Sequence, residues 1–324
     1  MTTTILNHSY FILDAKEKIT IADSFVHRSN KIGTGNGEAK FYLGNDNTEL
    51  HSFFGERGFH IRGFLLKKDL LRYLEDVKNE YLFPEQEYIN KTKLPELWEK
   101  RRKKVSELED IIWFTLEDQI QIQGSRVYVK SSDTAYDLIR ELSLPNITYI
   151  ASLKLLSETD ETFYYFRLFV DYFDENHHSI EIQCQEEAIE AEDLPLEQKK
   201  QLVSARSGQG KYRKALLEEC PFCPITIVAD DRLLIASHIK PWVASNDKEK
   251  VDPKNGFMLT PTYDFLFDRG FITFTDDKKM NVSPWLSKMT CSRLNLVPDK
   301  KYDMLPVEGR TDYLAYHREN IFKK

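Results

Sequence analysis

The 324-residue chain has no long apolar segment and few cysteines. Nothing approaches the roughly 18 apolar residues that a membrane-spanning helix needs. The first residues have neither the basic region nor the apolar core of a secretion signal. The cysteines are too few and too scattered for a disulfide scaffold; they are Cys184, Cys220, Cys223 and Cys291. We therefore expect a cytoplasmic protein without a membrane partner.

An excess of positive charge is also absent. The net charge is −7, which is not typical of a protein that coats nucleic acid. The charge is uneven: residues 201–324 hold 20 Lys and Arg against 16 Asp and Glu, a balance of +4. The preceding residues hold 25 against 36, a balance of −11. The C-terminal part is therefore the better suited to bind phosphate groups.

The length, with 41% hydrophobic and 30% charged residues, suits a soluble protein of two domains. The best boundary is an acidic stretch that contains Pro195. We predict an N-terminal domain over 1–185, an acidic linker over 186–200 and a C-terminal domain over 201–324.

Some N-terminal segments have the apolar spacing of strands and others have the apolar spacing of helices, which predicts a mixed α+β domain. Strands are expected over 10–13, 19–21, 40–43, 120–122, 126–129, 149–156, 163–173 and 179–183. Helices are expected over 64–82, 95–114 and 133–142. The second of these helices carries a basic run, Lys100–Lys104. This run is either a phosphate contact or a solvated helix face, since glutamates flank it, and we leave both interpretations open here.

The most informative stretch is Leu233–Ile272. An apolar run ends at His238, a polar loop reaches Asn255, a short apolar run follows, and residues 262–268 have helical spacing. This order predicts strand, loop, strand and helix, with His238 at the end of the first strand and Asp264 in the first turn of the helix. The two side chains would then face each other across one cleft.

These residue types suit phosphodiester hydrolysis. A neutral histidine can take a proton from water near pH 7, so His238 is the candidate general base. A divalent ion can polarise the phosphate, and Asp264 is its candidate ligand. Asn255 is expected to tie down the loop and orient the base. Asp268 lies one turn after Asp264 and either binds the metal as well or pairs with Arg269.

The combined pattern resembles the HNH (ββα-metal) endonuclease family, in a branch similar to restriction endonucleases. The resemblance covers about residues 206–324 and is carried by Ala236–Trp242, Asn255-Gly256 and Leu266–Asp268. It implies a C-terminal HNH nuclease domain and a metal-dependent endodeoxyribonuclease, a hydrolase that acts on double-stranded DNA.

This sequence departs from the family pattern at two positions. Asp264 stands at the last histidine of the motif, and an aspartate is as suitable a ligand for a hard divalent ion. Ser237 stands where many HNH nucleases carry an aspartate ligand, which leaves the metal open to a second carboxylate or to water. The expected cofactor is one divalent cation, Mg²⁺, with Mn²⁺ and Ni²⁺ as alternatives.

Several basic residues are candidates for DNA contact. They are Arg206, Lys211, Arg213, Lys240 and Arg269. The resemblance includes the stretch from Arg206 to Arg213, which either touches the DNA backbone or caps a helix and packs under the site. His317 and Arg318, in an expected C-terminal helix over 312–322, are assigned to packing.

A structural zinc is not expected. Cys220-Pro-Phe-Cys223 supplies two thiols, whereas a closed zinc site needs four ligands. The other two cysteines, Cys184 and Cys291, are single.

Three functions remain compatible with these patterns. In the first, the nuclease serves restriction or defence, and the N-terminal domain selects a DNA sequence or a modified base. In the second, that domain senses a small molecule or a protein and releases a nonspecific nuclease, which its acidic charge favours. In the third, the chain only binds DNA, against which the intact histidine–asparagine–aspartate set argues. A homodimer would allow two single-site nucleases to cut both strands.

Overall fold

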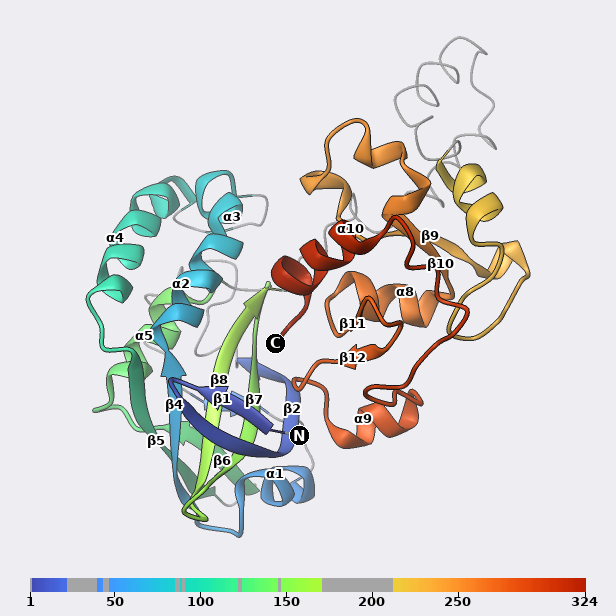
Figure 1. Cartoon of the computed structure of the whole chain (residues 1–324). Coiled ribbons are helices and arrows are strands. Elements are labelled where there is room, and N and C mark those ends of the chain that lie inside the picture. Colours follow the sequence, from blue (N-terminus) through green and yellow to red (C-terminus); the bar gives the residue numbers. More distant parts are fainter. Residues whose placement is uncertain are drawn as a thin grey trace. The chain divides into compact units, whose positions relative to one another are not determined.

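The computed structural model describes residues 2–21, 40–42, 47–84, 88, 91–121, 124–144, 147–170 and 212–324. They form two compact units (Figure 1). The first holds the described residues up to 170 together with Pro284–Lys288, and the second holds residues 212–283 and Met289–Lys324. The expected linker, 186–200, lies outside the described residues, so its boundaries remain a prediction. No helix in these ranges is long and apolar enough to cross a membrane.

The first unit is a mixed α+β domain built on one sheet, in agreement with the expected class. Its strands follow the order β1-β2-β3-β6-β5-β4-β8-β7. Their bounds are β1 (Thr2–Ile5), β2 (His8–Ile21), β3 (Lys40–Tyr42), β4 (His60–Leu66), β5 (Ile111–Gln121), β6 (Gly124–Val129), β7 (Thr148–Ser157) and β8 (Thr162–Val170). The pairing of β4 with β8 is parallel, whereas β4 with β5 and β7 with β8 are antiparallel.

The sheet closes on itself because β2 also pairs with β7. The chain of pairings runs from β2 through β3, β6, β5, β4, β8 and β7 back to β2. Register shifts in β2, between Ile12 and Asp14 and between Lys16 and Ile19, bend this long strand. Closure satisfies strand edges that would otherwise be open to pairing with another chain.

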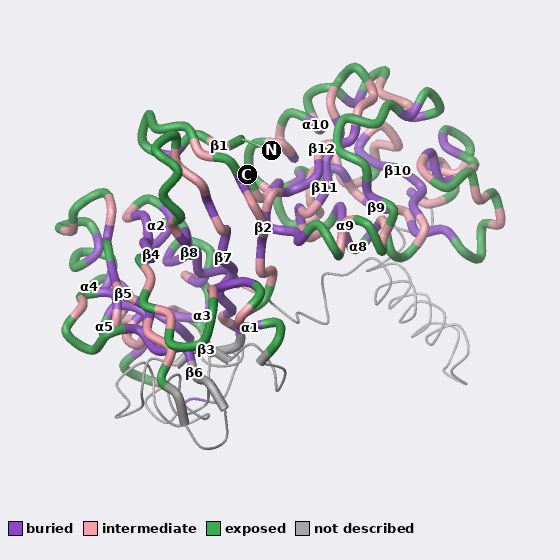
Figure 2. Tube along the Cα trace, turned by 90° about the horizontal axis from the view of Figure 1, so that it is seen from below, coloured by how far each residue is buried: buried purple, intermediate pink, exposed green. Residues whose placement is uncertain are grey.

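Helices cover one side of this sheet. They are α1 (Asn47–Phe54), α2 (Lys67–Asp76), α3 (Lys78–Leu82), α4 (Leu94–Ser106) and α5 (Thr134–Leu142), with a 3₁₀ turn η1 (Lys91–Lys93) before α4. The larger apolar core lies between them and the strands. A second core on the other face includes Phe64, Tyr165 and the fully buried Trp285. Figure 2 shows that β7 and β8 are buried along most of their length, as expected of strands with a core on each face.

Two expected helices were placed too broadly. The prediction over 64–82 was wrong for 64–66, which end β4, because this apolar segment runs without a break into the helical spacing of α2. The prediction over 95–114 was wrong for 111–114, which begin β5, since α4 ends at Ser106. The turn between α4 and β5 has no proline or glycine to mark the change from helix to strand.

The basic run on α4 is largely engaged within the first unit. Arg101 is buried and donates to the hydroxyl of Tyr81. Arg102 pairs with Glu75 at 3.1 Å, and Lys104 pairs with Glu141 at 2.6 Å. These contacts favour the interpretation of the run as a helix face over a phosphate contact.

The second unit contains two antiparallel hairpins and short helices. The strands are β9 (Ile235–His238), β10 (Gly256–Leu259), β11 (Ile272–Phe274) and β12 (Met280–Val282). The α-helices are α8 (Pro261–Asp268), α9 (Lys288–Arg293) and α10 (Thr311–Tyr316), and residues 212–219 are also helical. The 3₁₀ turns are η2 (Asp231–Leu233), η3 (Trp242–Ala244), η4 (Glu249–Val251) and η5 (Pro253–Asn255), and a π-helical turn, η6 (His317–Ile321), follows α10.

Candidate active site

The expected strand–loop–strand–helix order is present in the second unit. Strands β9 and β10 pair so that His238 lies opposite Gly256, and α8 packs on both strands. Helix α8 begins after Thr260, with Pro261 in its first turn, where proline is well tolerated. His238 therefore ends β9, Asn255 precedes β10, and Asp264 lies in the first turn of α8.

The ring of His238 is held on three sides. Its Nε2 lies 3.1 Å from the carbonyl oxygen of Lys250 in η4. The ring of Tyr212 stacks on it with centroids 4.1 Å apart and planes 14° apart. Trp242 presents its edge, with centroids 5.7 Å apart. These contacts fix the orientation of the imidazole before any substrate binds.

The contact with Lys250 also assigns the tautomer of His238. A carbonyl oxygen can only accept a hydrogen bond, so Nε2 carries the hydrogen and Nδ1 keeps its lone pair. Burial lowers the pKa of His238 to about 4, and the hydrogen bond to the Lys250 carbonyl opposes this shift. The imidazole is consequently neutral near pH 7, the form that a general base requires.

This pKa predicts the acid side of the pH–rate profile. Protonation removes the lone pair on Nδ1, so activity should fall only as the pH drops through about 4. We expect kcat/KM for DNA cleavage, measured between pH 4 and 8 at saturating divalent ion, to stay nearly constant from pH 7.5 to 5.5. An acid limb centred near the ordinary histidine pKa of roughly 6.5 would contradict this assignment.

Asn255 is fully buried and uses its side-chain amide within the loop. Its oxygen accepts from the Lys240 backbone amide at 2.8 Å. Its nitrogen lies 3.2 Å from the Lys240 carbonyl, 3.1 Å from that of Glu249 and 3.3 Å from the Ser245 hydroxyl. One side chain thus links the segment after β9 to η4, which carries the carbonyl that holds His238. The amide oxygen is already engaged, which favours positioning over metal binding.

Gly256 allows Tyr212 to reach the site. The Tyr212 hydroxyl donates to the Asn255 carbonyl at 2.9 Å. A Cβ atom at position 256 would lie 1.9 Å from this hydroxyl and 3.0 Å from Leu216 Cδ2. The backbone at Gly256 is extended, so close approach, not conformational freedom, requires glycine here.

Gly256→Ala is therefore expected to destabilise the second unit. Overpacking of this kind reduces the free energy of unfolding by about 2 kcal/mol or more, which urea denaturation would measure. Tyr212→Phe removes the clashing hydroxyl and provides the matched background, in which the effect of Gly256→Ala should be smaller. Equal effects in both backgrounds would mean that the two residues do not meet.

The two carboxylates of α8 have different surroundings. Asp264 is fully buried, and the residue is engaged within the protein. Asp268 is 41% exposed and lies 4.0 Å from Arg269 Nε. A metal ion bound by both carboxylates would therefore have one buried ligand, Asp264, and one solvent-exposed ligand, Asp268.

The described residues do not form a complete metal shell. No cluster of three or more His, Cys, Asp or Glu side chains with metal-binding spacing occurs among them. A hard divalent ion such as Mg²⁺ can bind through one or two carboxylates and keep several waters. Asp264, with Asp268 as a second candidate, would hold such an ion.

The candidate DNA-contact residues are only partly described. Arg206 and Lys211 lie outside the described residues. Arg213 donates to the backbone carbonyls of Leu234 at 2.9 Å and Asp231 at 2.6 Å. These bonds tie the helical residues 212–219 to the start of β9 and favour the packing interpretation of Arg213.

Lys240 and Arg269 are also engaged. The amine of Lys240 contacts both oxygens of Glu249, at 2.9 and 2.7 Å, and lies over the ring of Tyr316. Arg269 pairs with Asp268 and lies over Phe265. A role on DNA for either residue would require exchange of a carboxylate partner for a phosphate, and it remains a prediction.

The C-terminal segment packs as expected, although its regular α-helix is shorter. Helix α10 ends at Tyr316, and η6 continues it as a π-helical turn. His317 is buried, stacks on Phe267 with centroids 3.9 Å apart and contacts the Thr273 hydroxyl at 2.9 Å. Burial lowers the pKa of His317 to about 4, which is consistent with a neutral packing residue.

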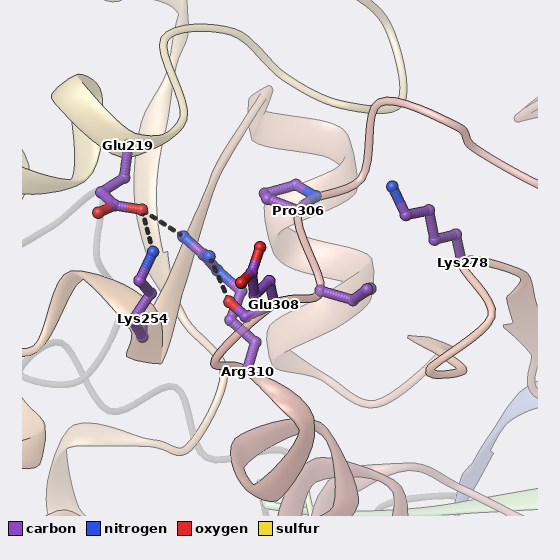
Figure 3. A pocket seen from close by; sticks show the side chains of 7 residues that line it. Glu219, Lys254, Lys278, Pro306, Glu308 and Arg310 are labelled. Carbon is purple, nitrogen blue, oxygen red and sulfur yellow. Dashed lines mark hydrogen bonds and ion pairs between the residues drawn. The ribbon is translucent and has the colours of Figure 1, made fainter.

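Arg310 contributes to the site without a signal in the sequence. It is almost fully buried and donates to the carbonyls of Gly256 at 3.1 Å and Pro253 at 3.2 Å. It lies at a pocket of about 440 Å³, where Glu219 forms ion pairs with both Arg310 and Lys254 (Figure 3). Arg310 therefore fixes the turn that leads into β10. Backbone carbonyls as partners cannot be read from residue types, which also explains why the Lys250 contact to His238 was not predicted.

The paired cysteines lie in the core of the second unit. Cys220 and Cys223 are buried. The Cys220 thiol donates to the Phe222 carbonyl at 3.3 Å, and burial raises the pKa of this thiol. Cys291 is partly exposed, and Cys184 lies outside the described residues.

A comparison with known protein families finds one match in this part of the chain. Residues 220–275 match the family of HNH endonucleases. The matched segment contains β9, β10, α8 and β11, together with His238, Asn255 and Asp264. No curated protein matches the chain. The C-terminal part therefore holds an HNH domain, which makes nuclease activity, with DNA as the implied substrate, the function that this domain supports. HNH nucleases generally depend on a divalent metal ion.

Proposed function

We propose that the protein is a metal-dependent DNA endonuclease in which His238 is the general base and Asp264 holds the ion. The observation that carries this proposal is the fixed, neutral imidazole of His238. Its Nε2 is engaged by the Lys250 carbonyl, its ring lies against Tyr212, and its Nδ1 keeps the lone pair.

In this proposal, Nδ1 of His238 takes a proton from a water molecule as the oxygen of that water bonds to phosphorus. The bond between phosphorus and the leaving oxygen then breaks. A bound divalent ion supplies charge neutralisation at the phosphate and at the leaving oxygen. Asn255 contributes by holding η4 in place. Asp264 would contribute its buried carboxylate, next to the strands, as a ligand of the ion. Arg206, Lys211, Arg213, Lys240 and Arg269 remain candidates for contact with the DNA backbone.

We further propose that the nuclease serves restriction or defence in the cytoplasm. The first unit would select a DNA sequence or a modified base, and a linker over 186–200 would join it to the nuclease domain. The closed sheet supports this division of roles, since it has its own core and contains none of the candidate catalytic residues. Two copies acting together would cut both strands.

Cleavage of modified and unmodified plasmid DNA by the purified protein tests the restriction role. We expect one of the two substrates to be cut at least about tenfold faster, a difference of about 1.4 kcal/mol in activation free energy. A second candidate, a nonspecific nuclease released by a ligand or a protein that binds the first unit, is favoured by the balance of −11 in residues 1–200. Equal, slow cleavage of both substrates would support this alternative.

A further inference from the structure

The first unit carries an exposed group of aromatic rings and one arginine on the sheet face opposite the helices. It consists of Tyr10 in β2, Arg62 in β4, Trp113 in β5 and Phe163 in β8. Trp113 is 38% exposed, Arg62 is exposed, and the other two are partly exposed. We call these four residues the aromatic–arginine patch.

Strand register places the patch on one face. Phe64 lies opposite Trp113 on β5 and beside Tyr165 on β8, and its ring stacks on that of Tyr165. Arg62 and Phe163 each precede one of these residues by two positions, so their side chains point to the same face. Strands β5, β4 and β8 are neighbours in the sheet (Figure 1).

The patch is continuous. The guanidinium carbon of Arg62 lies 4.4 Å from the ring centroid of Trp113 and 6.0 Å from that of Phe163. The rings of Trp113 and Phe163 have centroids 5.5 Å apart. Phe163 meets Tyr10 edge to face at 6.5 Å. The row therefore extends across strands that are far apart in the sequence.

Arg62 has its charge available. Among the described residues it makes no ion pair and no hydrogen bond, and it contacts only aromatic rings. The nearby Glu117 is instead 3.4 Å from His60. An exposed guanidinium over aromatic rings, without a carboxylate, complements an anionic ligand that also offers flat rings.

Single-stranded DNA has this combination of a phosphate backbone and unpaired bases. Proteins bind such strands by stacking bases on aromatic side chains beside cationic groups. Binding by stacking is also compatible with the acidic net charge of residues 1–200, because stacking needs few phosphate contacts. We propose that the aromatic–arginine patch binds a single-stranded segment of the target DNA, with bases on Trp113 and Phe163 and a phosphate on Arg62. This inference rests on the proposed DNA endonuclease function and assigns the contact that the first unit makes.

The test measures binding of a fluorescent 20-nucleotide oligothymidine to the full-length protein in EDTA, by anisotropy. Trp113→Ala and Arg62→Gln should each raise the Kd at least about fivefold, since stacking contributes roughly 1–3 kcal/mol per base. Phe83→Ala, which truncates a 76% exposed ring elsewhere in the first unit, is the matched control and should leave the Kd unchanged. Arg62→Gln alters an exposed side chain, so this variant should remain folded even if the Trp113→Ala variant does not.

Two further measurements separate this inference from the nuclease function. The wild-type affinity for the oligothymidine should fall less steeply with salt than its affinity for a duplex of the same length, because phosphate contacts dominate duplex binding. Cleavage of plasmid DNA with Mg²⁺ is recorded in parallel. A wild-type protein that cuts plasmid but does not bind the strand, or variants that bind it equally well, would overturn the patch and leave the nuclease intact. A protein that binds the strand through the patch but cuts nothing would overturn only the nuclease.

Discussion

His238→Ala should lower the rate of metal-dependent DNA cleavage by about 10²-fold or more, the typical contribution of a general base. The substitution removes the Nδ1 lone pair, while the contact of the ring with the Lys250 carbonyl uses Nε2. The measurement is the single-turnover rate on plasmid DNA with saturating Mg²⁺. DNA binding in EDTA should be unchanged, because no phosphate contact is assigned to His238.

His60→Ala provides the matched control for this substitution. His60 is an exposed histidine on β4 of the first unit, and it is assigned no part in the reaction. Its replacement should leave the single-turnover rate within about twofold of the wild-type rate. A His238→Ala protein that cuts as fast as this control would remove His238 from the mechanism.

Asp264→Ala should weaken divalent-ion binding and reduce cleavage with Mg²⁺ by about 10²-fold or more, because a catalytic ion contributes several kcal/mol to the transition state. Asp264→His should recover part of the activity with Mn²⁺ or Ni²⁺, since imidazole suits these softer ions better than Mg²⁺. Isothermal titration calorimetry with each ion gives the affinity independently of activity.

Two controls accompany the Asp264 variants. Asp264 is fully buried, so thermal unfolding must show that both variants remain folded. Asp268→Asn changes the exposed carboxylate one turn later and should alter ion affinity less than Asp264→Ala. If Asp264→Ala binds the ion with unchanged affinity, the ligand lies elsewhere and Asp268 becomes the first alternative.

The arrangement of β9, β10 and α8 was predictable because it is local. His238, Asn255 and Asp264 lie on one strand, one loop and one helix within a short segment. The strand and the helix each have a characteristic apolar spacing. A local succession of elements of this kind is the feature that a single sequence predicts best.

Long-range packing could not be predicted in the same way. The closure of β2 on β7 joins strands more than a hundred residues apart, and no residue type marks that pairing. The position of Trp285 in the core of the first unit depends on a five-residue segment, Pro284–Lys288, whose chain neighbours belong to the second unit. The stacking of Tyr212 on His238 similarly requires the packing of a helix against β10.

The measurement that tests the central claim most directly is cleavage of supercoiled plasmid by the purified full-length protein, with and without a divalent ion. We expect nicked or linear product with Mg²⁺ or Mn²⁺, none in EDTA, and recovery of cleavage when excess ion is restored. The His238→Ala protein, assayed in the same series, should give at most about a hundredth of the wild-type rate. Cleavage that persists in EDTA, or that survives the loss of His238 at the wild-type rate, would contradict the account.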